Sequence, residues 1–353
     1  YWKTTKDLLF DNQSIPGSSG FSSLDYINAG TMDNTGWEFN MSTNKLITTK
    51  DWTIDFNLNF SNNINKIVSL SESFLNAYNS EFSYTNGTYL SRLQQGNAIG
   101  SIYGFRYKGV YQYDKYLAGR EGTSPVARNA ANQVILDNNG NPSPMYFAYG
   151  TTSSYTFRGG DAIYEDVNHD GTIDELDIVY LGNSNPKMNG GFGTTIKYKK
   201  FSMNAFFNFR YGNKVLNLAR MNAENMYTNN NQSQSVNWRW RKDGDVTQIP
   251  RALYNYGFNW LGSDRFVEDG SFLRFKYLTF SYEFDKEQLK RLKLNQLNLY
   301  LTLNNVLTIS KYTGVDPEVS INMNPNYGLI GVSSDSNKTP RAKYFTFGIT
   351  LGL

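Results

Sequence analysis

A run of acidic and amide residues at 166–177, DVNHDGTIDELD, has the residue types and spacing of a calcium-binding loop. A hard cation such as Ca²⁺ takes six to eight oxygen ligands, and a loop of this kind supplies them from positions 1, 3, 5, 7, 9 and 12. Gly171 occupies position 6, where the chain has to turn sharply. We predict a structural Ca²⁺ site whose ligands are Asp166, Asn168, Asp170, the backbone carbonyl of Thr172, Asp174 and Asp177.

Two features of this loop leave a second interpretation open. Position 12 carries Asp177 where a calcium loop usually has glutamate, and the shorter side chain reaches an ion less well. No helical pattern flanks the loop, which favours a static loop staple over a switching EF-hand. The competing interpretation is an acidic turn that binds no ion.

Catalytic chemistry has few candidate side chains in this chain. There is no cysteine, so disulfides, thiol nucleophiles and zinc–thiolate sites are excluded. The single histidine, His169, falls at a non-ligand position of the acidic loop, and it cannot by itself make a convincing triad or zinc hydrolase site. No glycine-rich phosphate loop precedes a helical pattern. We predict no enzymatic activity.

Five of the aromatic residues in the long segment 214–270 are candidates for contact with a substrate or a partner protein. Aromatic faces stack on sugars or pack against peptide side chains. Packing of the loop against itself is the alternative interpretation. The five residues are Trp238, Trp240, Tyr254, Tyr256 and Trp260.

Strictly alternating runs show what kind of element carries these loops. At 277–284 the even-numbered residues are apolar or aromatic and most of the odd-numbered ones are polar, and at 297–304 four leucines alternate with Asn298, Tyr300, Thr302 and Asn304. Period-2 alternation gives a β-strand one apolar and one polar face. The same pattern recurs near 1–9, 36–47, 52–67, 192–198, 201–209 and 343–353, which makes about eight strands.

The connections between these strands fall into two alternating classes. Those near 48–51, 199–200 and 285–294 are short, and those over about 9–34, 68–186, 214–270 and 308–341 are long. Short turns on one side and long loops on the other are typical of outer-membrane barrels, whose strands cross the bilayer in about 9–11 residues. We predict an all-β fold, a transmembrane antiparallel β-barrel with long extracellular loops. A soluble β-sandwich would also explain the alternation, but not the loop asymmetry.

Composition limits the remaining possibilities. The net charge of +3 comes from dispersed charges, so we expect no nucleic-acid partner. No apolar run exceeds five residues, which rules out transmembrane helices. The chain begins at Tyr1, inside an expected strand, so we expect it to be a piece of a longer protein with a wider barrel.

Several blocks, in this order, resemble the C-terminal third of SusC/RagA-type TonB-dependent outer-membrane transporters of Bacteroidota. The blocks are NAGTMDNTGWEF at 28–39, EDVNHDGTIDELD with LGNSNPKMNGGFG at 165–193, RWRKDGDVTQIPRA at 239–252, FVEDGSFLRFKYLTFSYEF at 266–284 and NNVLTISKYTGVDPEV at 304–319. One departure is Leu353 at the end, where such barrels commonly have an aromatic residue.

The resemblance implies more than the residues alone do. It implies that this chain supplies about eight strands of a 22-stranded barrel in the cell outer membrane, with the plug and N-terminal domains outside residues 1–353. It implies import of oligosaccharides or peptides, a SusD-like surface lipoprotein as lid, and energy from TonB–ExbB–ExbD. The alternatives are a siderophore or cobalamin receptor of the TonB-dependent type, and a barrel adhesin with binding loops.

Overall fold

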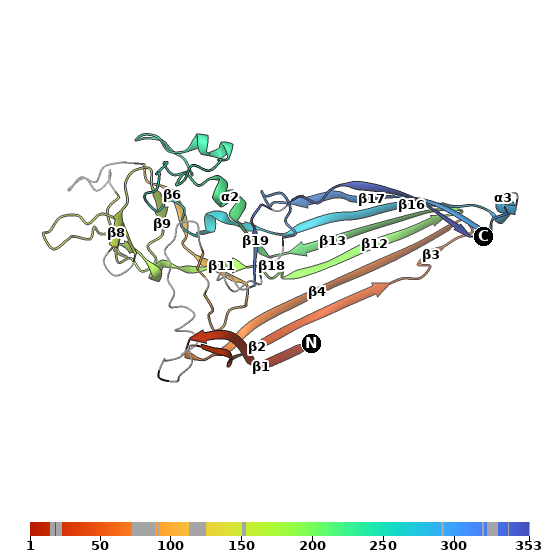
Figure 1. The fold of residues 1–353 in the computed structure, drawn as a ribbon, viewed down its shortest axis with the longest axis horizontal. Coiled ribbons are helices and arrows are strands. Elements are labelled where there is room, and N and C mark those ends of the chain that lie inside the picture. Colours follow the sequence, from red (N-terminus) through yellow and green to blue (C-terminus); the bar gives the residue numbers. More distant parts are fainter. Residues whose placement is uncertain are drawn as a thin grey trace.

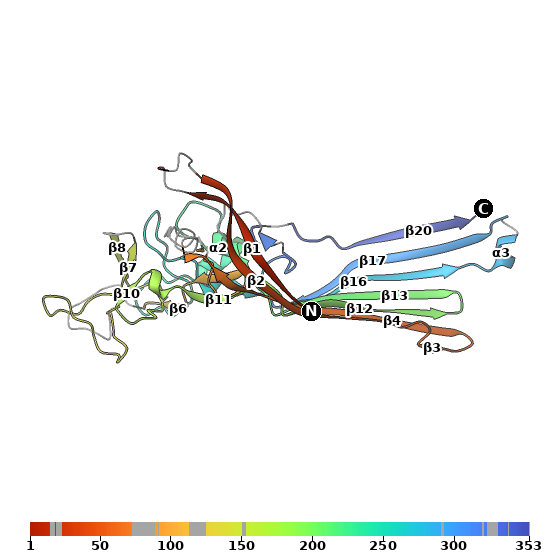
Figure 2. The same ribbon diagram turned by 90° about the horizontal axis from the view of Figure 1, so that it is seen from below.

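One antiparallel sheet dominates the structure, a computed structural model, and its long strands run side by side away from a mass of loops (Figures 1 and 2). The structure describes residues 1–14, 18, 23–72, 89–90, 92–112, 125–149, 153–290, 293–319, 321–322, 331–337 and 339–352. The short helix α3 (Lys286–Lys290) and the C-terminal end lie at the end of the sheet away from the loops (Figure 1).

The sheet has eight long strands in the order β1-β2-β4-β12-β13-β16-β17-β20, and each is antiparallel to its neighbours. The expected eight strands and their antiparallel arrangement are confirmed. Their bounds are β1 Trp2–Ser14, β2 Ser23–Ser42, β4 Trp52–Leu70, β12 Met188–Tyr198, β13 Phe201–Tyr211, β16 Phe272–Glu283, β17 Gln296–Ser310 and β20 Tyr344–Gly352; the two-residue β3 (Ile47–Thr48) also pairs with β4.

The register of the strands places the apolar residues of β4 to β20 on one common face. Leu58 pairs with Phe192, which pairs in turn with Phe207, and Ala205 pairs with Leu278. Because directly paired residues point to the same side of a sheet, the apolar runs join into one surface. We call it the apolar face, and its members are Trp52, Ile54, Phe56, Leu58, Phe60, Phe192, Ile196, Tyr198, Phe201, Met203, Ala205, Phe207, Phe209, Leu273, Phe275, Leu278, Phe280, Tyr282, Leu297, Leu299, Leu301, Leu303, Phe345, Phe347, Ile349 and Leu351.

Many side chains of the apolar face are uncovered. Phe345 is 72% exposed, Phe347 61% and Phe201 60%. A β-sandwich would bury such a face against a second sheet about 10 Å away. The exposure of these rings contradicts the soluble-sandwich alternative. The opposite, polar face carries Asn57, Asn59, Asn204, Thr279 and Thr302 among others.

Two neighbouring bulges keep this face continuous where the alternation in the sequence breaks. On β16, the registers with β13 and with β17 both shift between Phe275 and Tyr277. The shift lies opposite Phe206 and Phe207 of β13 on one side, and opposite Asn304 and Leu307 of β17 on the other. A bulge adds a residue to one strand without inverting the faces beyond it. Phe275 therefore returns to the apolar face, where its ring stacks on that of Phe207 at 4.3 Å between centroids.

One expected boundary is wrong. The long connection expected over about 9–34 is mostly strand, because β1 extends to Ser14 and β2 begins at Ser23. Pairing continues from Leu8↔Gly30 to Ser14↔Ser23 after a register shift. Backbone hydrogen bonds hold such a hairpin without alternating side chains, so the pattern in the sequence stops before the strands do.

The long connections fold into their own small sheets and helices at the loop end of the molecule (Figure 1). Two buried clusters hold them together, one around Phe147 and Phe157 and one around Leu216 and Phe266. No helix in the described part of the chain is long and apolar enough to cross a membrane. The elements are β5 Ser101–Gly104, β6 Tyr107–Val110, β7 Tyr146–Tyr149, β8 Ser153–Thr156, β9 Ala162–Tyr164, β10 Thr172–Ile173, η3 Glu175–Asp177, β11 Val179–Asn183, β14 Lys214–Asn217, α2 Leu218–Ala223, η4 Gln234–Trp238, η5 Asp264–Phe266, β15 Val267–Asp269, β18 Ile321–Asn322 and β19 Val332–Asp335.

Candidate functional site

The acidic loop at 166–177 is wound tightly by its own side chains. The Asp166 carboxylate accepts hydrogen bonds from the backbone N–H groups of Gly171 (2.8 Å) and Asp170 (3.2 Å). Asp170 in turn accepts from the N–H of Thr172 at 2.8 Å. Gly171 has φ +87°, and a Cβ there would lie 2.8 Å from the Cβ of Ala127. The glycine is therefore required by both the turn and the packing, as its position in the loop suggested.

The end of the loop is held by Asp177, which is fully buried. Its carboxylate accepts from the N–H groups of Val167 (2.7 Å) and Asp174 (2.9 Å), and Asp174 accepts from the N–H of Leu176. Asp174 and Asp177 form a capping box at the start of η3. Burial raises the pKa of the Asp177 carboxyl from 3.8 to about 6, and the charges of Asp166 and Asp174 add to the rise.

The predicted ligands thus lie in one loop, but most of their oxygens face backbone N–H groups. Asn168 donates to Asp170 at 2.8 Å rather than pointing away from it. Across the described residues, no three histidine, aspartate or glutamate side chains converge as a metal site requires. The loop has the spacing of a calcium site and the hydrogen bonds of an acidic turn.

The five candidate aromatic residues separate into two groups by exposure. Trp238 is 77% exposed, Tyr254 62% and Tyr256 59%. Trp240 is buried, and its ring covers Gly160, where a Cβ would lie 2.3 Å from the ring. Trp260 is half-buried and packs on the cluster around Leu216 and Phe266. Trp238, Tyr254 and Tyr256 therefore present more of their rings to solvent than Trp240 and Trp260 do.

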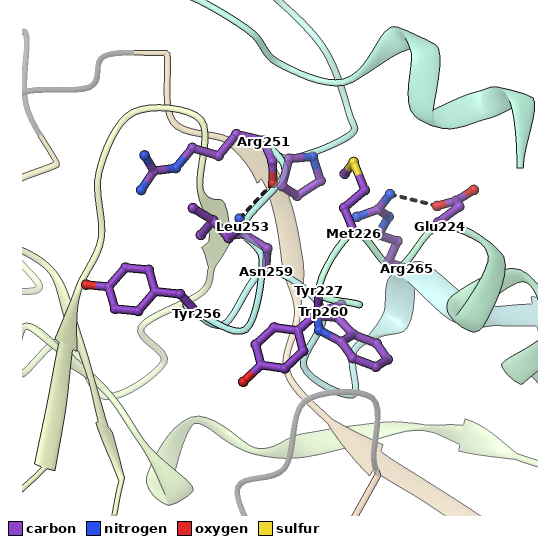
Figure 3. Close-up of a pocket in the computed structure, with 10 residues that line it drawn as sticks. Glu224, Met226, Tyr227, Arg251, Leu253, Tyr256, Asn259, Trp260 and Arg265 are labelled. Atoms are coloured by element: carbon purple, nitrogen blue, oxygen red, sulfur yellow. Dashed lines mark hydrogen bonds and ion pairs between the residues drawn. The ribbon is translucent and has the colours of Figure 1, made fainter. Parts of the chain in front are cut away.

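A small pocket brings Trp260 and Tyr256 together with charged side chains (Figure 3). Arg265 donates to Glu224 at 2.7 Å on one side, and the Arg251 carbonyl accepts from Asn259 at 3.2 Å on the other. Arg251 also binds the buried Asp161 at 2.7 Å. Each arginine therefore has a carboxylate partner within the loops, so this pocket joins loop segments.

A larger pocket, of about 440 Å³, opens on the polar face where the wall strands meet the loops. Asn208 Oδ1 and Ser333 Oγ are buried there without a hydrogen-bond partner among the described residues. Arg210 lies over the Phe272 ring at 5.9 Å. Aromatic rings beside unsatisfied amide and hydroxyl groups suit a polar ligand. The alternation had placed Asn208 on the polar face, but nothing in the sequence placed Ser333 beside it.

A cluster of four charges joins a wall strand to the last long loop, and the sequence analysis did not predict it. The buried Arg274 of β16 donates to Asp316 at 2.6 Å and to Glu318 at 3.0 Å. Arg341 pairs with the same two carboxylates, at 3.4 and 3.2 Å. The only signal is that Arg274 and the Asp-Pro-Glu triplet both stand in family-like blocks.

A second charged cluster fixes the neighbouring loops. Glu268 accepts from the N–H and the hydroxyl of Thr313, both at 2.8 Å, and pairs with Arg220 at 3.1 Å. Arg220 and Arg265 both pair with Glu224. The two clusters tie the described parts of the 212–270 and 311–341 segments to each other and to the wall strand β16.

Comparison with solved structures shows which fold this is. The RagAB peptide transporter matches 100% of this chain and 32% of its own chain, with a TM-score of 0.64 and 23% identity. The RagAB peptide importer in its open-open state matches with a TM-score of 0.65 and 21% identity. The eight-stranded sheet therefore has the fold of a barrel wall.

Sequence comparison gives the family. No protein-family model matches the chain. TonB-dependent receptor P3 of Formosa agariphila is 30% identical over an alignment of 359 positions that covers 99% of this chain and 31% of that receptor. TonB-dependent receptor SusC of Bacteroides thetaiotaomicron is 25% identical over 99% of this chain and 29% of its own length. Over nearly its whole length the chain resembles a third of the SusC/RagA-type TonB-dependent receptors.

This chain spans about a third of the length of the TonB-dependent receptors that it matches. The similarity covers the wall strands and the long loops alike, since 99% of the chain is aligned. The relatives are receptors and transporters, and none of those named is an enzyme. The strand pattern, the uncovered apolar face and the comparisons all indicate a barrel wall similar to that of SusC/RagA-type receptors.

Proposed function

We propose that the protein containing this chain imports oligosaccharides or peptides across the outer membrane in a TonB-dependent manner. The observation that carries this proposal is the apolar face, which is continuous in register over β4 to β20 and largely uncovered. A surface of this kind is stable in lipid once the sheet is part of a closed barrel, in which no backbone group is left unpaired. The similarity to TonB-dependent receptors supports import as the function of this wall.

A row of aromatic rings supports the orientation of the wall. At the short-turn end, Trp52 contacts Tyr198 with ring centroids 4.5 Å apart, and Phe201 contacts Tyr282 at 4.7 Å. These residues are cross-strand neighbours in one line across four strands. Aromatic girdles mark the interfaces of such barrels, and short turns face the periplasm. The long loops then lie outside the cell.

The cargo and the partners complete the proposal. The pocket beside Asn208 opens on the polar face, and Trp238, Tyr254 and Tyr256 have exposed rings in the loops; both features support a polar cargo. We propose a SusD-like surface lipoprotein over the loops, and energy supplied by TonB–ExbB–ExbD through parts outside this chain. The RagAB structures are of a peptide transporter, and this supports peptides as one cargo class.

Purification of the intact protein from native outer membranes in mild detergent tests the proposal. We expect a surface lipoprotein to co-purify, with an oligosaccharide or peptide identified by mass spectrometry. A bound iron chelate or corrinoid without a lipoprotein would instead indicate a siderophore or cobalamin receptor. Binding of the cells to host or matrix protein, with no uptake defect after gene deletion, would indicate an adhesin.

We further propose that the 166–177 loop binds Ca²⁺ through Asp166, Asn168, Asp170, Thr172, Asp174 and Asp177. The ligand spacing supports this, as does the tight turn at Gly171 with φ +87°. The ion would be a structural staple, and it would need some carboxylates to exchange backbone N–H groups for the cation. The alternative, an acidic turn, keeps all the bonds described above.

Limited proteolysis distinguishes the two interpretations. With Ca²⁺ present, Asp166→Ala and Asp170→Ala should speed cleavage at 160–185, and a chelator should have the same effect on the unmodified protein. Glu175→Ala is the matched control, because Glu175 is exposed and stands at a non-ligand position of the same loop. Cleavage that is unchanged by chelator would establish the acidic turn.

A further inference from the structure

A groove of about 390 Å³ lies at the loop end of the wall, beside β4 and beyond the first residue of β12. Its sides come from segments far apart in the sequence: β4 at Ile64, β11 at Tyr180, the segment before β12 at Lys187, and β14 at Lys214. Asn62 Nδ2 donates to the Lys187 carbonyl at 2.6 Å and so joins β4 to the segment before β12. The groove is therefore part of the folded wall.

The charges that line this groove are all positive. Lys187 and Lys214 line it and no carboxylate does. Neither lysine forms an ion pair among the described residues. Lys214 stands opposite Asp269 in the β14–β15 pair and its charge acts on that carboxylate, whose Oδ1 also accepts from the Ser271 hydroxyl at 2.6 Å and from its N–H at 3.0 Å. The lining of the groove itself carries two positive charges and no negative one.

Both lysine stems are held against glycines. A Cβ on Gly212 would lie 2.8 Å from Cγ of Lys187, and one on Gly182 would lie 2.6 Å from Cγ of Lys214. The missing side chains make room for the two aliphatic stems. Packing of this kind restricts the ammonium groups, so less rotamer entropy is lost when an anion binds.

The groove also borders the apolar face. Ile64 continues the even-numbered apolar residues of β4 and is 60% exposed. Tyr211 is 59% exposed, and its carbonyl accepts a hydrogen bond from the Lys187 N–H. The 11 residues of β13 rise about 33 Å along the strand, which at a tilt of about 40° is about 25 Å of height. An apolar band of a barrel is about 25 Å tall, so Tyr211 stands at its outer edge.

We propose that this groove binds the phosphate headgroup of an anionic lipid in the outer leaflet of the membrane. The two lysines would contact the phosphate, while Ile64 and the neighbouring apolar face would meet the acyl chains. The proposal rests on the outer-membrane placement argued above. Each lysine near a membrane surface strengthens attraction to anionic lipid by about fivefold in affinity.

Native mass spectrometry of the intact receptor in detergent, with added phosphatidic acid or phosphatidylcholine, tests the site. We expect preferential retention of phosphatidic acid, weakened about fivefold by Lys187→Gln or Lys214→Gln alone and further by both. The double variant Lys197→Gln/Lys199→Gln removes the same charge at the short-turn end and should retain phosphatidic acid as the unmodified protein does.

Three outcomes would overturn the proposal in distinguishable ways. If the receptor inserts into lipid vesicles but retains both lipids equally, the proposed headgroup site is disproved and the transporter proposal stands. Displacement of phosphatidic acid by an equal concentration of inorganic phosphate would assign the groove to a free anion. Failure of the unmodified receptor to insert into vesicles would remove the membrane placement and this site with it.

Discussion

At the scale of single residues, Asp177 shows how one side chain can make a loop sensitive to pH. It is fully buried, and its pKa is raised from 3.8 to about 6. A raised folded-state pKa means that the unfolded chain loses its proton first as the pH rises. Without Ca²⁺, the loop is therefore most stable below about pH 4 and loses stability up to about pH 6, by at most about 3 kcal/mol.

Replacing Asp177 by asparagine should remove this dependence. Asn keeps an oxygen that accepts one backbone N–H but does not titrate. Hydrogen exchange at 166–177, measured in chelator between pH 4 and 7 and corrected for intrinsic rates, checks the expectation. A pH-dependent protection that persists in Asp177→Asn would mean that another group in the loop is responsible.

Arg274 is the second residue whose removal should be costly. Arg274 is 2% exposed and binds two carboxylates. Arg274→Met therefore leaves Asp316 and Glu318 with the more exposed Arg341 as their remaining ion-pair partner. Breaking a buried pair in this way costs about 3 kcal/mol. We expect faster proteolysis in 310–341 and a lower thermal midpoint of the intact receptor.

Arg341→Met is the matched control, since Arg341 binds the same carboxylates with a side chain 41% exposed. Exposed pairs contribute about 0–1 kcal/mol, so its effect should be small. Equal losses in the two variants would show that Arg274 is no more important than a surface charge.

The residue scale is also where prediction from sequence was weakest. The five loop aromatics look alike in the sequence, yet Trp240 is buried over Gly160 while Trp238 is 77% exposed. Their difference depends on a contact between segments about 80 residues apart, and no local pattern encodes that. The acidic loop was different, because its turn at Gly171 and its internal bonds involve residues no more than about ten apart.

At the scale of strands, glycines on the polar face make room for rings. A Cβ on Gly348 would lie 2.1 Å from the ring of Tyr300, its partner in the β17–β20 register. Gly348→Ala should therefore push Tyr300 out of place and cost about 1–3 kcal/mol. The fraction of receptor that migrates as folded barrel without heating measures the loss.

Two further variants show whether the ring is the cause. Thr350→Ala changes the same face of β20 two residues away and should leave folding unchanged. Gly348→Ala/Tyr300→Ala removes the ring and should recover part of the loss. If the double variant folds worse than Gly348→Ala alone, the close approach of the ring to Gly348 is not the source of the defect.

At the scale of the whole molecule, charged substitutions on the two faces of β17 should reduce the stability of the folded barrel by different amounts. Leu301 lies on the apolar face and Thr302 on the polar face. In lipid, Leu301→Arg should destabilise the folded barrel by about 2–4 kcal/mol, whereas Thr302→Arg faces the wet side and should cost less than about 1 kcal/mol. Urea titration of the receptor in lipid vesicles compares them. The reverse order would mean that the apolar face does not contact lipid.

The eight strands, their antiparallel arrangement and the side that each residue of the alternating runs faces followed from the sequence alone. Side-chain alternation is a local property with a period of 2, so a few residues in a row determine both the element and its faces. The extra length of β1 and β2 was missed, because backbone pairing there continues without alternation. The family-like blocks added the type of barrel.

The tertiary structure decided what the loops bring together. Arg274 and Asp316 are 42 residues apart, and Asn62 and Lys187 are 125 apart. Such contacts depend on the path of the whole chain between the two residues, and short-range sequence patterns do not determine that path. The strands of this wall are thus determined locally, while its charged clusters and its lysine groove exist only because the whole chain has folded.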